Sequence, residues 1–165
     1  LKKIVNLANK FGIKYKKDLS SYLPIAIGAY GDSLLNITNA YSIINNKGQL
    51  IKPSVIKDIK SKKGKIIWEN KFVTSKIIDR QIANKLNYLL ENSVEGGTGL
   101  AASIEGRKIF GKTGTSDQNK DLWFIGSIKN LTTGIWIGFD DNRETNFSSG
   151  TSANFWRTYI KSINI

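Results

Sequence analysis

The stretch Phe110-Gly111-Lys112-Thr113-Gly114-Thr115-Ser116 combines a fixed cation, two hydroxyl groups and a glycine. Side chains alternate between the two faces of an extended strand, so Lys112 and Gly114 share one face and Thr113 and Thr115 the other. Because Gly114 has no Cβ, a second extended chain can lie close to this backbone and hydrogen-bond to it. Lys112 and the threonine hydroxyls would then hold a carboxylate at the end of that chain. The stretch therefore predicts a site for a peptide C-terminus.

The residues around this stretch have the period of two that is typical of β-strands. Apolar and polar side chains alternate over Lys108–Ser116, Leu122–Lys129 and Thr133–Asp140, and short polar turns separate these segments. Three such segments in succession predict an antiparallel meander. Two further runs of β-branched or aromatic residues, Leu50–Lys60 and Lys65–Glu69, predict a separate hairpin.

Helical spacing of apolar residues predicts four helices in the rest of the chain. They are expected over residues 1–11, from a cap at Asp32 and Ser33 to about residue 45, from a cap at Asp79 to about residue 94, and from a cap at Ser152 to residue 163. The side chains expected to be buried in the last two helices are Ile82, Ala83, Leu86, Leu89 and Leu90, and Phe155, Trp156, Tyr159, Ile160 and Ile163. The sequence thus predicts an α+β fold in which helices flank an antiparallel sheet.

The composition excludes several kinds of catalytic site within this chain. With no cysteine and no histidine in 165 residues, the chain holds neither a Ser-His-Asp triad nor a thiolate nucleophile. A general base here must be a lysine, a tyrosine or a carboxylate. The net charge of +12 favours an anionic partner. The lysines are scattered among asparagines and isoleucines, however, which is more typical of a solvated surface than of a nucleic-acid interface.

Several motifs around the central stretch occur together in one protein family. Lys112-Thr113-Gly114 is similar to the third signature motif of the penicillin-binding proteins and serine β-lactamases. Gly97-Thr98-Gly99, Asp121–Gly126 and Gly134–Asp141 resemble the corresponding segments of the bifunctional, class A penicillin-binding proteins. The resemblance covers nearly the whole chain. It implies the penicillin-binding protein and serine β-lactamase-like transpeptidase fold, in which lysine activates a serine without histidine.

The resemblance also implies a D,D-transpeptidase that cross-links peptidoglycan stem peptides and is acylated by β-lactams. Lys112 would attract the terminal carboxylate and tune proton transfer at the serine, and the hydroxyls of Thr113 and Thr115 would bind that carboxylate. The backbone N–H of Thr115 would be one oxyanion-hole donor. Gly114 would let the donor peptide add as a β-strand. The expected partners are stem peptides, β-lactams and an upstream part of the same protein, without a cofactor, a metal ion or nucleic acid.

The other two signature motifs of the family, Ser-x-x-Lys and Ser-x-Asn, are expected upstream of Leu1. Ser54-Val55-Ile56-Lys57 matches the first in letters but follows Pro53 in a predicted strand instead of opening a helix. Ser152-Ala153-Asn154 matches the second, but it follows Lys-Thr-Gly, whereas the family has it before. Residues 1–165 are therefore expected to be the C-terminal portion of a transpeptidase domain, inactive alone. The parent would lie outside the cytoplasm, anchored to the inner membrane by a segment preceding this chain.

Three alternatives remain open at the level of sequence. A serine β-lactamase shares Lys-Thr-Gly, and a non-catalytic module could bind peptidoglycan or nucleic acid through the excess positive charge. Gly106–Thr113 also matches the letters of a phosphate-binding loop, but the segment that follows predicts a strand where such a loop requires a helix. Asp140 and Asp141 are adjacent on a predicted strand and point to opposite faces, which favours a structural or turn role over a metal-binding or acid–base pair.

Overall fold

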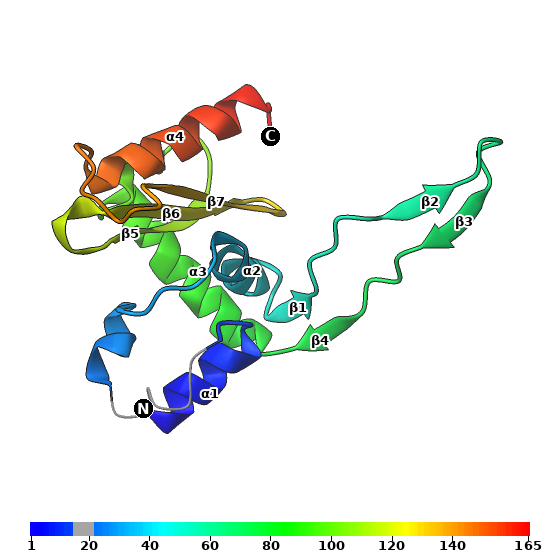
Figure 1. Ribbon diagram of the computed structural model, residues 1–165, viewed down its shortest axis with the longest axis horizontal. Helices are drawn as coiled ribbons and strands as arrows, with labels where there is room; N and C mark the ends of the chain where they lie inside the picture. Colours follow the sequence, from blue (N-terminus) through cyan, green and yellow to red (C-terminus); the bar gives the residue numbers. More distant parts are fainter. Residues whose placement is uncertain (15–21) are drawn as a thin grey trace.

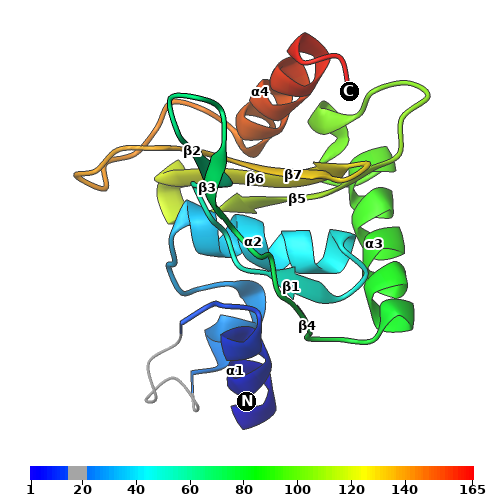
Figure 2. The same ribbon diagram turned by 90° about the vertical axis from the view of Figure 1, so that its right-hand side faces the viewer.

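The computed structural model describes residues 1–14 and 22–165 and shows an α+β fold (Figure 1). A three-stranded antiparallel sheet lies between helix α4 on one face and helix α2 on the other, and a two-stranded ribbon projects from this body (Figures 1 and 2). The predicted fold class is therefore confirmed. Pro24, Gly28 and Gly31 predict that residues 13–31 form no long helix or strand, and part of this segment, residues 15–21, lies outside the described residues.

The described residues form four α-helices and seven β-strands. The helices are α1 (Lys2–Lys10), α2 (Leu34–Asn45), α3 (Arg80–Glu95) and α4 (Ser149–Ser162), with short 3-10 turns η2 (Leu23–Ile27), η3 (Leu100–Ala102) and η4 (Asp117–Asn119). The strands are β1 (Gln49–Ile51), β2 (Asp58–Lys60), β3 (Ile66–Glu69), β4 (Thr74–Lys76), β5 (Ile109–Thr115), β6 (Asp121–Ile128) and β7 (Leu131–Gly138). No described helix is both long and apolar enough to reach across a bilayer.

The predicted meander is present as the sheet β5-β6-β7, in which β5 is an edge strand. Gly114 lies opposite Trp123, and Trp123 lies opposite Trp136, so the three strands are in continuous register. A core cluster fills the space between this sheet and α4, with Phe124 and Trp156 in an edge-to-face contact at 5.4 Å between ring centroids. This packing fixes β5 relative to the helices.

Helix α2 begins as the sequence predicts, because the Ser33 hydroxyl accepts a hydrogen bond from the Asn36 N–H at 3.2 Å. Asp79 occupies the N-cap position of α3, but its carboxylate forms an ion pair with Lys76 instead of a side-chain cap. Helix α1 ends before Gly12, whose φ of 89° suits the left-handed conformation that follows a helix.

Helix α4 corrects two predictions. It begins at Ser149, after an N-cap at Ser148, so Ser152 is not the cap but a buried residue of the first turn. Trp156 and Ile160 are buried as expected, whereas Phe155, Tyr159 and Ile163 are exposed. The apolar stripe predicted from spacing alone is wider than the surface that the sheet covers.

The buried face of helix α3 is also narrower than the spacing of its apolar residues predicts. Ala83 is buried, but Ile82 and Leu89, which were predicted on the buried side, are 48% and 61% exposed. The sheet body contacts only part of the circumference of α3, because the helix lies beside the edge strand β5 and does not cross under the sheet (Figure 2).

The predicted hairpin is longer and less regular than the sequence indicates. The run Leu50–Lys60 is not one strand, because residues 52–57, around Pro53, form no ladder. Instead β1 pairs with β4 near the body, and β2 pairs with β3 farther out. We call residues 49–76 the ribbon and the β5-β6-β7 sheet with α2, α3 and α4 the body.

Candidate active site on the edge strand

The backbone of β5 directs alternate hydrogen-bonding groups away from β6, at the outer edge of the sheet. The Ser116 N–H donates to the Asp121 carbonyl on β6 at 3.1 Å. Because hydrogen-bonding direction alternates along an antiparallel strand, the odd-numbered residues Thr113 and Thr115 direct their N–H and C=O groups away from β6. No strand among the described residues pairs with this edge. The edge can therefore accept an extended peptide.

The Lys112 ammonium group lies at this same edge. Its Nζ is 3.0 Å from the Thr113 carbonyl oxygen, 3.2 Å from Thr98 Oγ1 and 3.4 Å from Thr113 Oγ1. The predicted alternation holds for the strand, yet the long lysine side chain bends round the edge to reach the threonine on the opposite face. The result is an exposed positive charge that is held in position by three oxygen atoms.

Thr98 completes this arrangement, and sequence reasoning gave it no role in the site. The Thr113 hydroxyl donates to Thr98 Oγ1 at 2.8 Å, and Thr113 itself is only 9% exposed. On either side of Thr98, a Cβ at Gly97 would come within 2.8 Å of the Ser93 carbonyl oxygen, and one at Gly99 within 3.0 Å of the same atom. The two glycines thus let the loop pack against the end of α3, where Thr98 meets Lys112.

The other two predicted site residues differ in their surroundings. Thr115 is exposed, and the strand register directs its N–H away from β6. A Cβ at Gly114 would lie 3.2 Å from Trp123 Cβ on β6. The absence of a side chain at this position therefore serves packing within the sheet as well as access to the strand. The four predicted site residues, Lys112 to Thr115, all lie on β5 because they are consecutive in sequence. Thr98, from the loop after α3, is the residue that the structure brings to them.

The turn after β5 is fixed by the carboxylate of Asp121. Asp121 accepts hydrogen bonds from the Ser116 hydroxyl at 3.0 Å and from Trp136 Nε1 at 2.9 Å. The carbonyl of Asn119 accepts two further bonds from Thr145. These contacts hold the end of β5 next to Thr115. Within the described part of the chain, the Asp141 carboxylate interacts locally, with Arg143.

Two other matches in the sequence have no catalytic geometry. Ser54 lies in an irregular, exposed segment and its hydroxyl hydrogen-bonds to the backbone of Ile56, so it does not open a helix that would return Lys57 to it. Ser152 donates to the Ser149 carbonyl inside α4. The described residues also contain no group of three side chains suited to bind a metal ion.

Comparison with known proteins identifies the fold. The sequence profile of the penicillin binding protein transpeptidase domain matches residues 4–159. The chain belongs to this transpeptidase family. The class A resemblance is confirmed as well: the chain is 40% identical over 117 residues to penicillin-binding protein 1A of Clostridium tetani, a match that covers 69% of the chain and 15% of that protein. It is 31% identical over 161 residues to penicillin-binding protein 1A of Clostridium acetobutylicum, covering 96% of the chain and 20% of that protein.

Solved transpeptidase structures have the same fold. Penicillin-binding protein 1A from Haemophilus influenzae superposes with a TM-score of 0.81 at 25% identity, over 94% of this chain and 29% of that one. An imipenem acyl-enzyme complex of penicillin-binding protein A from M. tuberculosis has a TM-score of 0.82 at 16% identity, over all of this chain and 43% of that one. The chain spans about a fifth or less of the length of the two Clostridium relatives.

Proposed function

We propose that this chain is the C-terminal portion of a peptidoglycan D,D-transpeptidase domain and supplies its substrate-binding strand. The observation that carries the proposal is the open edge of β5, where outward backbone groups of Thr113 and Thr115 lie beside the fixed Lys112 ammonium. A stem peptide ending in D-Ala-D-Ala is an extended chain with a terminal carboxylate, and this edge offers a partner to both features. Family membership supports the reaction class.

The reaction needs a serine that precedes Leu1 and a lysine to accept its proton. The serine oxygen bonds to the penultimate D-Ala carbonyl carbon, the peptide bond breaks, and the terminal D-Ala leaves with the proton on its nitrogen. An amine of a second stem peptide then displaces the serine and forms the cross-link. With a β-lactam, the serine opens the ring and the acyl group stays attached. The acyl-enzyme complex of the M. tuberculosis relative is consistent with this step.

Each residue of the strand has a separate role in this proposal. Lys112 attracts the substrate carboxylate and tunes proton transfer at the serine. Thr115 binds the carboxylate through its exposed hydroxyl and donates its N–H to the oxyanion, a contact whose loss typically costs about 3 kcal/mol of transition-state stabilisation. The Thr113 hydroxyl donates to Thr98 and through it positions Lys112; to bind the carboxylate as well, this hydroxyl would turn away from Thr98 when the substrate enters. Gly114 keeps the strand flat against the donor peptide.

The proposed cellular site is the outer side of the cytoplasmic membrane, where peptidoglycan is built, with an anchor in the segment before Leu1. By itself the chain is proposed to be inactive, because neither Ser54 nor Ser152 has the surroundings of a nucleophile.

The deciding experiment is labelling with a fluorescent penicillin, with intact mass as the readout, on this chain and on a form extended upstream. Only the extended form should gain a stable adduct, on a serine before Leu1. An adduct on the chain itself would overturn the fragment proposal, with Ser54 as the first residue to map. Labelling of neither form would favour a binding module, and rapid turnover of the adduct would favour a β-lactamase.

Variants of the extended form test the roles of the strand. Lys112→Ala should reduce the acylation rate by at least about a hundredfold, whereas Lys108→Ala, a change of equal charge on the neighbouring surface, should leave it within about twofold of the original rate. Thr98→Val removes the oxygen that accepts hydrogen bonds from both Lys112 and Thr113, so it should slow acylation at least about fivefold. Thr98→Ser keeps that oxygen and should restore the rate. Equal effects of the valine and serine substitutions would show that the Thr98 hydroxyl does not position Lys112.

A further inference from the structure

The ribbon extends away from the body farther than any other described part of the molecule (Figure 1). It leaves after α2, returns before α3, and consists of the β1-β4 ladder at its base and the β2-β3 ladder near its tip. The tip lies far from the body, so a large flat partner can reach it without first meeting the sheet or the helices.

Half of the net charge of the chain is in this ribbon. Residues 52–76 contain eight lysines and two carboxylates, a net charge of +6 out of +12 for the whole chain. Four of these lysines lie at the tip, at positions 60, 62, 63 and 65, with no acidic residue among them. Such a concentration of positive charge on a projecting element attracts an anionic surface.

The same element exposes large apolar side chains. Ile59 and Trp68 lie directly opposite each other in the β2-β3 ladder and therefore share one face, and they are 47% and 45% exposed. Elsewhere in the ribbon, Val55, Ile67, Phe72 and Val73 are also exposed. Apolar groups gathered on a projecting element indicate a contact that removes them from water.

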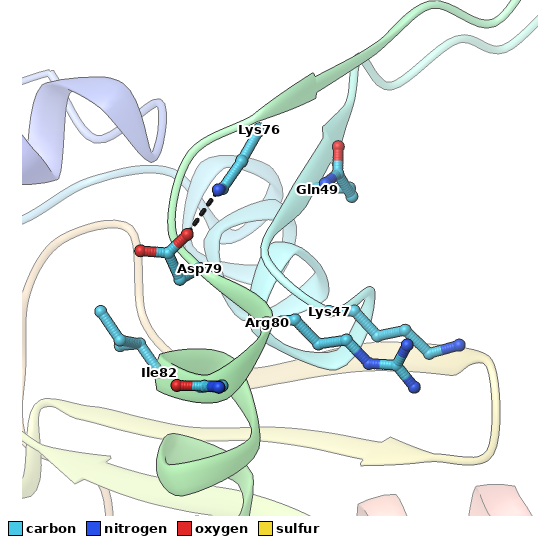
Figure 3. Close-up of a pocket in the computed structure, with 7 residues that line it drawn as sticks. Lys47, Gln49, Lys76, Asp79, Arg80 and Ile82 are labelled. Atoms are coloured by element: carbon cyan, nitrogen blue, oxygen red, sulfur yellow. Dashed lines mark ion pairs between the residues drawn. The ribbon is translucent and has the colours of Figure 1, made fainter.

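The base of the ribbon continues the positive surface. A hollow of about 610 Å³ between β1, β4 and the start of α3 is lined in part by Lys47, Lys76 and Arg80 (Figure 3). Asp79 neutralises Lys76, while Lys47 and Arg80 point away from this pair and have no acidic partner among the described residues. The positive potential therefore runs from the tip to the body.

We propose that the ribbon docks on the surface of an anionic phospholipid bilayer. An anionic polymer would satisfy the lysines but leave Ile59, Ile67 and Trp68 in water, and a neutral apolar partner would desolvate the lysines. A bilayer interface meets both requirements, because tryptophan favours the headgroup level and lysine stems extend along apolar surface with the ammonium in water. The proposal does not depend on the reaction assigned to β5.

Vesicle co-sedimentation with the 165-residue chain tests the charge requirement. The chain should bind phosphatidylcholine vesicles that contain phosphatidylglycerol, release from them as salt rises, and not bind phosphatidylcholine alone. Lys62→Glu combined with Lys63→Glu should weaken binding at least about 25-fold, about fivefold for each lysine. The matched control, Lys85→Glu with Lys161→Glu on α3 and α4, makes the same change in net charge. If the control weakens binding equally, the ribbon is not the docking element.

Trp68 tests the apolar requirement. Its fluorescence should shift to the blue on anionic vesicles, and Trp68→Phe should abolish that part of the signal while retaining binding. Trp68→Ala should weaken binding about tenfold, with an unchanged thermal unfolding temperature to show that the body is intact. Binding that is equally tight to soluble polyphosphate, without a Trp68 shift, would identify a polyanion site and overturn the bilayer proposal.

Discussion

The body and the ribbon both contain large apolar residues, but only the body buries them. Trp156 and Phe124 are fully buried between α4 and the sheet, whereas Trp68 and Ile67 of the ribbon are 45% and 69% exposed. Both regions have antiparallel ladders with defined register. The difference shows that strand pairing alone does not make a core, because a two-stranded ladder has no second layer to cover its faces.

Glycines of the body and of the ribbon also differ in how closely other atoms surround them. A Cβ at Gly126 would come within 2.5 Å of Trp156 and 2.6 Å of Phe124, whereas one at Gly64, in the ribbon turn, would have no atom within 4 Å. Gly126 is therefore required by close packing. Gly64 is favoured only by its φ of 82°.

Replacement of one tryptophan in the body and one in the ribbon should give the largest difference in the free energy of unfolding. Trp156→Ala should lower the free energy of unfolding by about 3–5 kcal/mol, because it leaves a cavity in the core. Trp68→Ala should lower it by no more than about 0.5 kcal/mol. Urea unfolding followed by circular dichroism measures both. A large loss for Trp68→Ala would mean that the ribbon contributes to the stability of the body.

Substitution of the two glycines should give the next largest contrast. Gly126→Ala should destabilise the protein by about 1–3 kcal/mol, since the new methyl group must displace two rings. Gly64→Ala strains the turn, but the tip can open locally without unfolding the body, so the midpoint of thermal unfolding should hardly change. Similar shifts for the two variants would contradict the independence of the ribbon tip.

Substitution of one aspartate in the body and one in the ribbon compares the energies of polar contacts in the two regions. Asp121→Ala removes the acceptor for Ser116 and Trp136 and should cost about 1–2 kcal/mol. Asp58→Ala removes an ion pair with Lys60 at 3.7 Å and a carboxylate that lies opposite Glu69. Its effect on the denaturation midpoint should stay within about 0.5 kcal/mol. A costly Asp58→Ala variant would show that the ribbon ladder is stabilised by its charges.

The smallest expected effect concerns pH. Burial raises the pKa of Tyr41 on α2 above its usual value of 10.0, whereas the ribbon contains no tyrosine. Because the folded state favours the neutral phenol, this stabilisation is complete below about pH 10 and is lost as the pH rises through the raised pKa. Tyr41→Phe should make the alkaline fall in stability less steep. Tyr88→Phe, at an exposed position of α3, is the matched control and should leave the slope unchanged.

The sheet of the body could be predicted well because the alternation of apolar and polar side chains that indicates a strand is visible in a few consecutive residues. The period of two over β5, β6 and β7 placed the three strands within about two residues of their observed ends. Ser33 was predicted as a cap for the same reason, since the bond to Asn36 spans only three residues. The family resemblance rested on these same segments and is confirmed.

The features that sequence reasoning missed depend on contacts through space. Which serine caps α4 could not be read from the polar run before it, and Ser152 is buried because it faces the core beside Trp156. The break in the ribbon and strand β4 depend on pairing between segments about 25 residues apart. Thr98 was noted only as part of a motif, because its contact with Lys112 joins a loop to a strand.

The spacing of the Thr98 contacts has a consequence for the order of folding. Thr98 reaches Lys112 and Thr113 across 14 and 15 residues, whereas the Asn45 amide that ties α2 to the sheet reaches Lys129 across 84 residues. Closing the longer loop costs about 1.5 kcal/mol more in chain entropy. We therefore expect amides near the Thr98 contact to gain protection from hydrogen exchange earlier during refolding than those around Asn45. Strand β5 would then be shaped by its nearest neighbours in sequence before helix α2 has docked on the sheet.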